Sequence, residues 1–177
     1  ESDRPFVLEE ATISDIHAAF LSGTLTCQGL VAGYLARIEA YDDRGPSLNA
    51  ILTVNPRALE RAAEMDANRV SDPATMKPLH CVPVVLTDNY DTADLPTTGG
   101  SVILAESIPV DDAFVVQRLR EAGALILAKA NLTELARGGT TVSSLGGQTK
   151  NPYDLTRTPG GSSGGTGAAV SANFAAI

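Results

Sequence analysis

The sequence is short of basic residues. Its 177 residues contain 13 Lys and Arg against 21 Asp and Glu, which gives a formal net charge of -8. A surface that binds nucleic-acid phosphates needs clustered Lys and Arg, and here no two basic residues are adjacent in the sequence. We therefore expect no nucleic-acid partner.

Long apolar runs are also missing. No stretch approaches the roughly 20 apolar residues that span a bilayer, so we expect no membrane partner. The longest run, residues 122–128, contains a glycine and is typical of a buried strand. The sequence starts at Glu1 instead of Met and cannot show whether a targeting segment was removed. A cytoplasmic and a secreted location both stay open.

Cysteine is scarce, and Cys27 and Cys81 are too few for a disulfide framework. They permit one disulfide or two buried thiols, and buried thiols are the expectation. What is present is an ordinary globular composition, with 44% apolar and 19% charged residues. The length fits one domain with its own core.

The first part of the chain, residues 1–70, predicts helices. Ser14 is expected to cap a first helix that ends at Gly23, and Thr26 to cap a second. In the second helix, apolar residues at helical spacing predict one buried stripe. These residues are Leu30, Val31, Tyr34, Leu35 and Ile38.

A third helix is predicted from the Asn55-Pro56 pair, a capping residue followed by proline. Good helix formers continue over residues 58–69, and the polar residues 71–77 predict a loop.

Residues 78–177 read differently, as the start of an α/β core. The β-branched run at residues 82–86 predicts a strand buried on both faces, and residues 124–128 predict a second. Between them, a helix is expected to begin after Asp111 and to end at Gly123. A strand, helix and strand at this spacing form a βαβ unit, which predicts parallel pairing. A final Ala-rich segment covers residues 168–177.

A glycine- and serine-rich loop at residues 159–165 precedes that segment. Paired glycines allow close backbone approach, and the N–H groups at the start of a following helix can face a negative charge. A flexible linker would be longer, and a phosphate loop would carry the lysine of G-x-x-x-x-G-K-[ST], which is absent. A catalytic or anion-binding loop is therefore favoured.

The loop resembles the signature of the amidase-signature serine hydrolases, and so do four further segments in the same order. Residues 48–51 resemble the family's "LNA" segment, and residues 78–89 its "PL-x-GIP-x-x-x-KD" strand. Residues 128–134 resemble "GKTN-x-x-E", and residues 146–154 the stretch that leads into the serine loop. The resemblance implies the N-terminal part of one amidase-signature domain over residues 1–177. Its fold is α/β, with a mixed, mostly parallel sheet, helices on both faces and preceding N-terminal helices.

The resemblance also implies a Ser–cis-Ser–Lys mechanism for amide hydrolysis, with a small-molecule amide as substrate and no metal or cofactor. Ser162 takes the place of the bridging serine, with a cis peptide bond next to it and its hydroxyl directed towards Thr87. Loop support is implied for Gly160, Gly161, Ser163, Gly164, Gly165 and Asp88. Substrate contacts are implied for Thr133, Glu134, Leu135 and Ala136.

The sequence departs from the family pattern at the catalytic lysine, where it has Thr87. Threonine does not accept a proton near neutral pH, so the relay lacks its base. Lys129 lies in the segment that resembles "GKTN-x-x-E", where the family's lysine does not serve as the base. Thr87 is consistent with a natural non-catalytic relative, or with a deliberate removal of the lysine; the intact motif around it favours a recent single change.

A second departure is that the family's nucleophile motif lies beyond Ile177, together with the oxyanion hole. We therefore expect this chain to be inactive and the sheet to end at an open edge. The missing C-terminal portion, or a second copy in a homo-oligomer, would be the partner that covers it. Two other functions stay open: the glutamine-hydrolysing A subunit of an amidotransferase, and a non-catalytic binding or assembly module.

Overall fold

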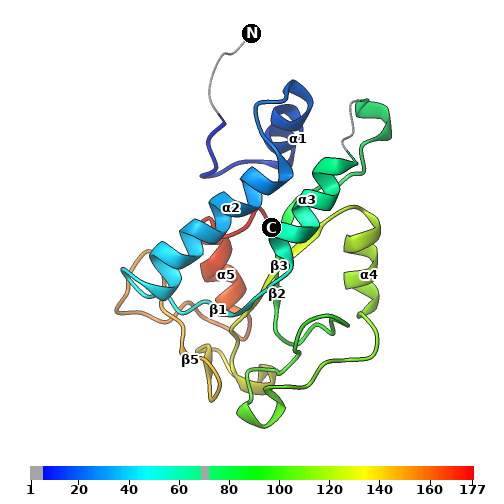
Figure 1. Ribbon diagram of the computed structural model, residues 1–177. Helices are drawn as coiled ribbons and strands as arrows, with labels where there is room; N and C mark the ends of the chain where they lie inside the picture. Colours follow the sequence, from blue (N-terminus) through cyan, green and yellow to red (C-terminus); the bar gives the residue numbers. More distant parts are fainter. Residues whose placement is uncertain (1–5, 69–71) are drawn as a thin grey trace.

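The computed structural model describes residues 6–68 and 72–177. Its centre is a three-stranded sheet in the order β1-β3-β2 (Figure 1). The strands β2 and β3 run parallel, as the βαβ prediction required, and β1 is antiparallel to β3. The sheet strands are β1 (Ile51–Val54), β2 (Pro83–Thr87) and β3 (Leu125–Ala130). A separate two-stranded ribbon pairs β4 (Val142–Ser143) with β5 (Gly147–Gln148).

Helices cover both faces of the sheet, as the family resemblance implied. On one face, Val85 of β2 packs in the larger core with α1, α2, α3 and α5. On the other face, Val84 and Leu86 pack against Val116 of α4 (Figure 1). The α-helices are α1 (Ile13–Ser22), α2 (Cys27–Ile38), α3 (Ala58–Ala67), α4 (Phe114–Glu121) and α5 (Gly164–Ser171). Shorter turns are η1 (Glu39–Asp43), η2 (Pro73–Thr75), η3 (Val102–Leu104) and η4 (Glu134–Ala136).

For the first two helices, one predicted cap is wrong and two predicted boundaries are correct. Thr12, not Ser14, caps α1, because Asp15 completes a capping box with it. The Thr12 hydroxyl accepts from the Asp15 N–H at 3.2 Å, and the Asp15 carboxylate accepts from the Thr12 N–H at 3.0 Å. Gly23 ends the helix in the left-handed conformation, and the Thr26 hydroxyl caps α2 through the amide three residues on.

The stripe predicted for α2 is confirmed. Leu30, Val31, Tyr34 and Ile38 are buried in the larger core, and Leu35 packs against it. The side chain of Tyr34 is among the largest fully buried ones in the protein. Its burial raises the pKa of the phenol to about 12.

The predicted caps of α3 and α4 are wrong. Arg57 precedes α3, and the Asn55 side chain instead accepts from the Arg57 N–H and donates to the Ile126 carbonyl in β3. Ala113 precedes α4 without a side-chain cap, so Asp111 does not start it. Gly123 does follow the end of α4. Predictions for Glu1, Arg69 and Ser71 concern positions outside the described residues.

The cysteines form a disulfide, so the expectation of buried thiols is wrong. Cys27 at the start of α2 and Cys81 just before β2 have Cα atoms 5.8 Å apart. Their separation of 54 residues in the sequence gives no sign of this contact. In the folded chain, both cysteines belong to one core together with residues of α1, α2 and β2.

The free edge of β2 is partly paired. The Ile177 carbonyl accepts from the Val85 N–H at 2.9 Å, and the Ala176 N–H donates to the Pro83 carbonyl at 3.2 Å. The predicted open edge therefore does not extend over the first residues of β2.

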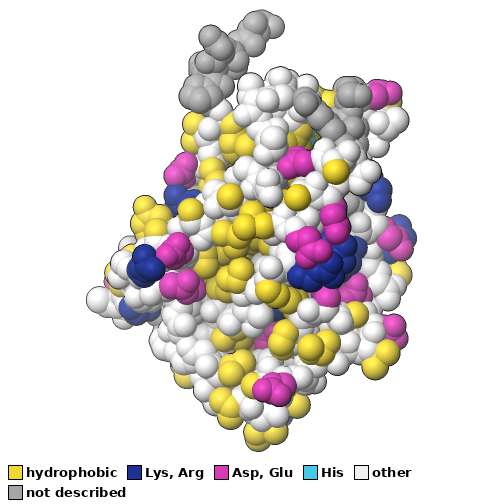
Figure 2. Space-filling model, viewed as in Figure 1, with side chains coloured by type: hydrophobic (Ala, Val, Ile, Leu, Met, Phe, Trp, Pro, Cys, Tyr) yellow, Lys and Arg dark blue, Asp and Glu magenta, His cyan; other side chains and the backbone are white. Residues whose placement is uncertain are grey.

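Charged side chains on the face in Figure 2 lie with acidic groups next to basic ones. Two ion pairs lie along α3, between Arg57 and Glu60 and between Arg61 and Glu64. Among the described helices, none is long and apolar enough to cross a membrane.

Candidate active site

Thr87, where the family resemblance leads us to expect the catalytic lysine, is the last residue of β2 and pairs with Ala130 of β3. It is only 5% exposed. Its hydroxyl oxygen lies 2.7 Å from that of Thr166, the third residue of α5. Because the last two residues of the serine loop are the first two of α5, this contact brings the end of β2 close to the loop. Sequence reasoning gave Thr166 no role.

The serine loop has the backbone that the resemblance implied at one point: the Gly161–Ser162 peptide bond is cis. The Ser162 carbonyl accepts a hydrogen bond from the Thr133 N–H at 2.8 Å. The first residue of the predicted substrate segment and the predicted bridging serine are therefore neighbours. The hydrogen bonds of the described residues join Thr87 to Thr166 and include none between Thr87 and Ser162.

Thr141 holds this loop in place, and the sequence analysis missed it. Its hydroxyl donates to the Gly160 carbonyl at 2.6 Å and accepts from the Gly164 N–H at 3.1 Å. Its own N–H donates to the Thr133 hydroxyl at 2.9 Å. Thr141 is fully buried and bonds to both sides of Ser162, so it fixes the loop relative to residue 133. Only its place in the Gly- and Thr-rich stretch that starts at Gly138 could have drawn attention to it.

Two loop glycines have clear reasons for being glycine. Gly160 has φ of 82°, a left-handed conformation that disfavours other residues. Gly165 lies against the backbone of Asn131, where an added Cβ would overlap the carbonyl group. The Gly165 N–H donates to that carbonyl at 3.1 Å. Ser163, immediately before α5, makes no side-chain capping bond, and its carbonyl accepts from the Gly167 N–H.

Asn131 links the start of α5 to the β4–β5 ribbon, although the sequence indicated it only as part of a motif. Its side-chain N–H₂ donates to the Gly147 carbonyl at 3.1 Å and to the Thr149 hydroxyl at 3.0 Å. Its side-chain oxygen accepts from the Ser143 hydroxyl at 2.7 Å. The β4–β5 ribbon thus bonds to the Asn131 side chain, while the start of α5 bonds to the Asn131 main-chain carbonyl.

The predicted substrate segment, Thr133 to Ala136, is buried at its start and exposed at its end. Thr133 is buried, whereas Leu135 and Ala136 are exposed and have positive φ values of 52° and 56°. The Leu135 N–H donates to the Gly99 carbonyl at 2.8 Å, which helps to hold this uncommon conformation. The Glu134 carboxylate accepts from Ser144, and this bond lowers its pKa below the usual value.

Asp88 and Lys129 form a buried ion pair directly beside Thr87. The ammonium nitrogen of Lys129 lies 3.4 Å from a carboxylate oxygen of Asp88, and both side chains are almost fully buried. Burial lowers the pKa of Lys129, and the Asp88 charge opposes that shift. The other Asp88 oxygen accepts from the N–H and the hydroxyl of Thr98.

Four further acceptors lie within hydrogen-bond distance of the Lys129 ammonium group, all in the segment that follows β2. The Tyr90 and Pro96 carbonyls lie 2.9 Å from its nitrogen. The hydroxyls of Thr92 and Thr97 lie at 3.1 and 2.9 Å. An ammonium group has three protons, so these acceptors are enough to engage every N–H donor of Lys129. Lys129 therefore ties β3 to the loop at residues 88–99. The last residue of that loop, Gly99, has the carbonyl that accepts from the Leu135 N–H.

Comparison with known proteins identifies the family. The family profile described as Amidase matches residues 29–177. The chain is 40% identical over 171 residues to the A subunit of the glutamyl-tRNA(Gln) amidotransferase of Alkaliphilus metalliredigens, with 96% of this chain and 34% of that protein covered. It is 44% identical over 179 residues to a probable amidase of Arabidopsis thaliana, with 97% and 34% covered.

Among solved structures, the native peptide amidase from Stenotrophomonas maltophilia superposes with a TM-score of 0.90 at 43% identity. The match covers 97% of this chain and 36% of that one. The chain thus spans about a third of the length of the relatives that it matches.

Proposed function

From the premise that the chain belongs to the amidase family, we propose that the whole protein binds a small-molecule amide at the serine loop and is organised to hydrolyse its C–N bond. The observation that carries this proposal is the contact between Thr87 and Thr166. It supports the proposal because Thr87, which we expect at the position of the base, contacts α5, the helix whose first residues belong to the serine loop.

In the proposed mechanism, Ser162 passes a proton from a nucleophilic serine to a base at position 87. A serine hydroxyl is inert at its own pKa and needs such a base. The Thr87 hydroxyl cannot act as one near neutral pH, and Lys129 is engaged by five partners. We propose that the protein with Thr87 binds amides without turning them over.

The test is Thr87→Lys in the full-length protein, assayed with peptide amides and simple amides. Turnover should rise by a factor on the order of 10³ or more, because members of a catalytic unit each account for most of its rate. Activity should increase with pH on the alkaline side, since the lysine must be unprotonated. Thr87→Met is the matched control, because methionine is about as long as lysine but has no basic group, and this variant should stay inactive.

The same experiment can contradict the proposal in two ways. If Ser162→Ala leaves the turnover of the Thr87→Lys protein unchanged, Ser162 is not the bridging serine. If Thr87→Lys protein folds and binds an amide but does not hydrolyse it, the protein is a binding or assembly module.

A second candidate is the glutamine-hydrolysing component of an amidotransferase, favoured by the names of several relatives at 40 to 45% identity. Glutamine and peptide amides, offered separately to the Thr87→Lys protein, distinguish the two. Preference for free glutamine, with ammonia as product, would support the amidotransferase function.

A further inference from the structure

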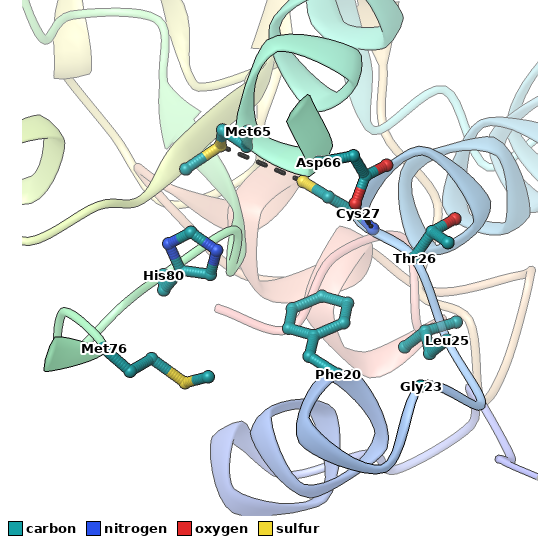
Figure 3. A pocket seen from close by; sticks show the side chains of 9 residues that line it. All are labelled: Phe20, Gly23, Leu25, Thr26, Cys27, Met65, Asp66, Met76 and His80. Atoms are coloured by element: carbon teal, nitrogen blue, oxygen red, sulfur yellow. Dashed lines mark hydrogen bonds between the residues drawn. The ribbon is translucent and has the colours of Figure 1, made fainter. Parts of the chain in front are cut away.

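A cavity of about 180 Å³ lies between α1, α3 and the start of α2, away from the serine loop (Figure 3). Its wall includes Phe20, Cys27, Met65 and His80. The exposed Gly23 and Thr26 also line it and connect it with solvent. Neither the proposed hydrolysis nor the residues of the serine loop use this cavity.

The two sulfur atoms of the disulfide differ in their access to the cavity. Cys27 lines it, and Figure 3 shows its side chain pointing into the space next to Met65, with the sulfur atoms of these two residues 3.9 Å apart. Both cysteines are buried, with Cys27 2% and Cys81 0% exposed, but Cys81 is not among the described residues that line the cavity. Thiol–disulfide exchange needs a thiolate to reach one sulfur atom, so the route through the cavity leads to Cys27.

We propose that Cys27 is a thiol-exchange site, at which a small thiol that enters this cavity opens the Cys27–Cys81 disulfide. The thiolate sulfur bonds to Cys27 Sγ, and the bond to Cys81 Sγ breaks. Cys81 leaves as a thiolate and takes up a proton. A second thiol then displaces Cys27 from the mixed disulfide, so that two thiols are oxidised to one disulfide and two protein thiols are formed.

His80 lies in the cavity wall where it can take the proton of the entering thiol. Its ring meets that of Phe20 edge-on, with centroids 6.2 Å apart. Desolvation lowers its pKa, with His17 and Lys77 acting in the same direction and Asp66 against it. Glu64 and Arg120 line an adjoining cavity that also includes His80. A neutral imidazole is the form that accepts a proton.

Asp66 sets the charge of the cavity. Its two carboxylate oxygens accept from the Cys27 N–H at 2.7 Å and the Gln28 N–H at 2.9 Å, so it also fixes the start of α2. Because an anionic thiol would approach this carboxylate, the site favours neutral and cationic thiols.

The experiment uses oxidised full-length protein, without denaturant, and limiting cysteamine or 2-mercaptoethanesulfonate. N-ethylmaleimide quenches the reaction, and peptide mass spectrometry locates the adducts. We expect the small thiol on Cys27 and maleimide on Cys81. At equal thiolate concentration, cysteamine should react faster than the sulfonate by a factor on the order of ten. The Asp66 carboxylate attracts the ammonium group of cysteamine and repels the sulfonate group of the other thiol.

Two variants test the route through the cavity and the effect of the Asp66 charge. Met76→Trp fills the cavity from its wall and should slow the exchange severalfold while leaving the protein folded. Asp66→Asn should reduce the difference between the two thiols. Small-thiol adducts mainly on Cys81, or exchange that is as fast in Met76→Trp as in the parent protein, would overturn the proposal. So would an absence of exchange until denaturant is added.

Discussion

Replacing Lys129 with methionine tests whether this lysine is a fixed structural group or a potential base. Methionine keeps the apolar stem of the side chain and removes the ammonium group. Asp88 would then be buried without its counter-ion, and four acceptors would lose their donor. At 3.4 Å the attraction within the pair is about 5 kcal/mol at an effective dielectric constant of about 20, before the cost of desolvation.

Removal of one partner from a buried pair costs about 3–5 kcal/mol, and we expect Lys129→Met to lower the free energy of unfolding by that amount. Urea unfolding followed by far-ultraviolet circular dichroism measures it. The variant Asp88→Asn should also destabilise the protein, and the double variant should cost less than the sum of the two. A loss below about 1 kcal/mol for Lys129→Met would mean that the lysine is loosely held, and it would reopen the possibility that Lys129 is the base.

Three further predictions concern the loop, a helix cap and pH. Gly165→Ala should lower the free energy of unfolding by more than about 3 kcal/mol or prevent folding, since the added Cβ would overlap the Asn131 carbonyl. At Gly167 an added Cβ meets nothing within 4 Å, so Gly167→Ala should be neutral or stabilising in urea unfolding. Thr12→Ala should cost about 1 kcal/mol by the same measurement, and Ser14→Ala much less. The lowered pKa of His80 means that the unfolded chain binds this proton more tightly, so stability should fall as the pH drops through 6.5, and His80→Leu should flatten that part of a melting-temperature profile.

The elements predicted well from sequence are those whose signal is local and complete. Thr26 and the apolar stripe of α2 lie within one helix, and the βαβ unit has two strongly apolar strands. The cap of α1 could also have been found, because Thr12 has an acidic residue three positions on, whereas Ser14 has His17 there. The strand β1 could not be found in this way. Its four residues are too short for a clear period, and they become a strand by pairing with β3.

At the candidate site, the motif located the serine loop and its cis peptide bond but not the residues that hold them. Thr141 acts through bonds to residues 133, 160 and 164, which come together only in the folded chain. The same is true of the pairing of Cys27 with Cys81. Sequence motifs record residue types along one segment, whereas these roles depend on contacts between segments.

The side chain at position 87 contributes little to the scaffold around it. Among the described hydrogen bonds, the Thr87 hydroxyl takes part in the one to Thr166, while the loop is held by Thr141 and by the Gly165 contact with Asn131. The segment after β2 is held by Lys129 and Asp88 without any part of the Thr87 side chain. Because these hydrogen bonds do not involve the Thr87 side chain, replacing it leaves their donors and acceptors in place, and Thr87→Lys therefore tests the proposed base separately from these loop contacts.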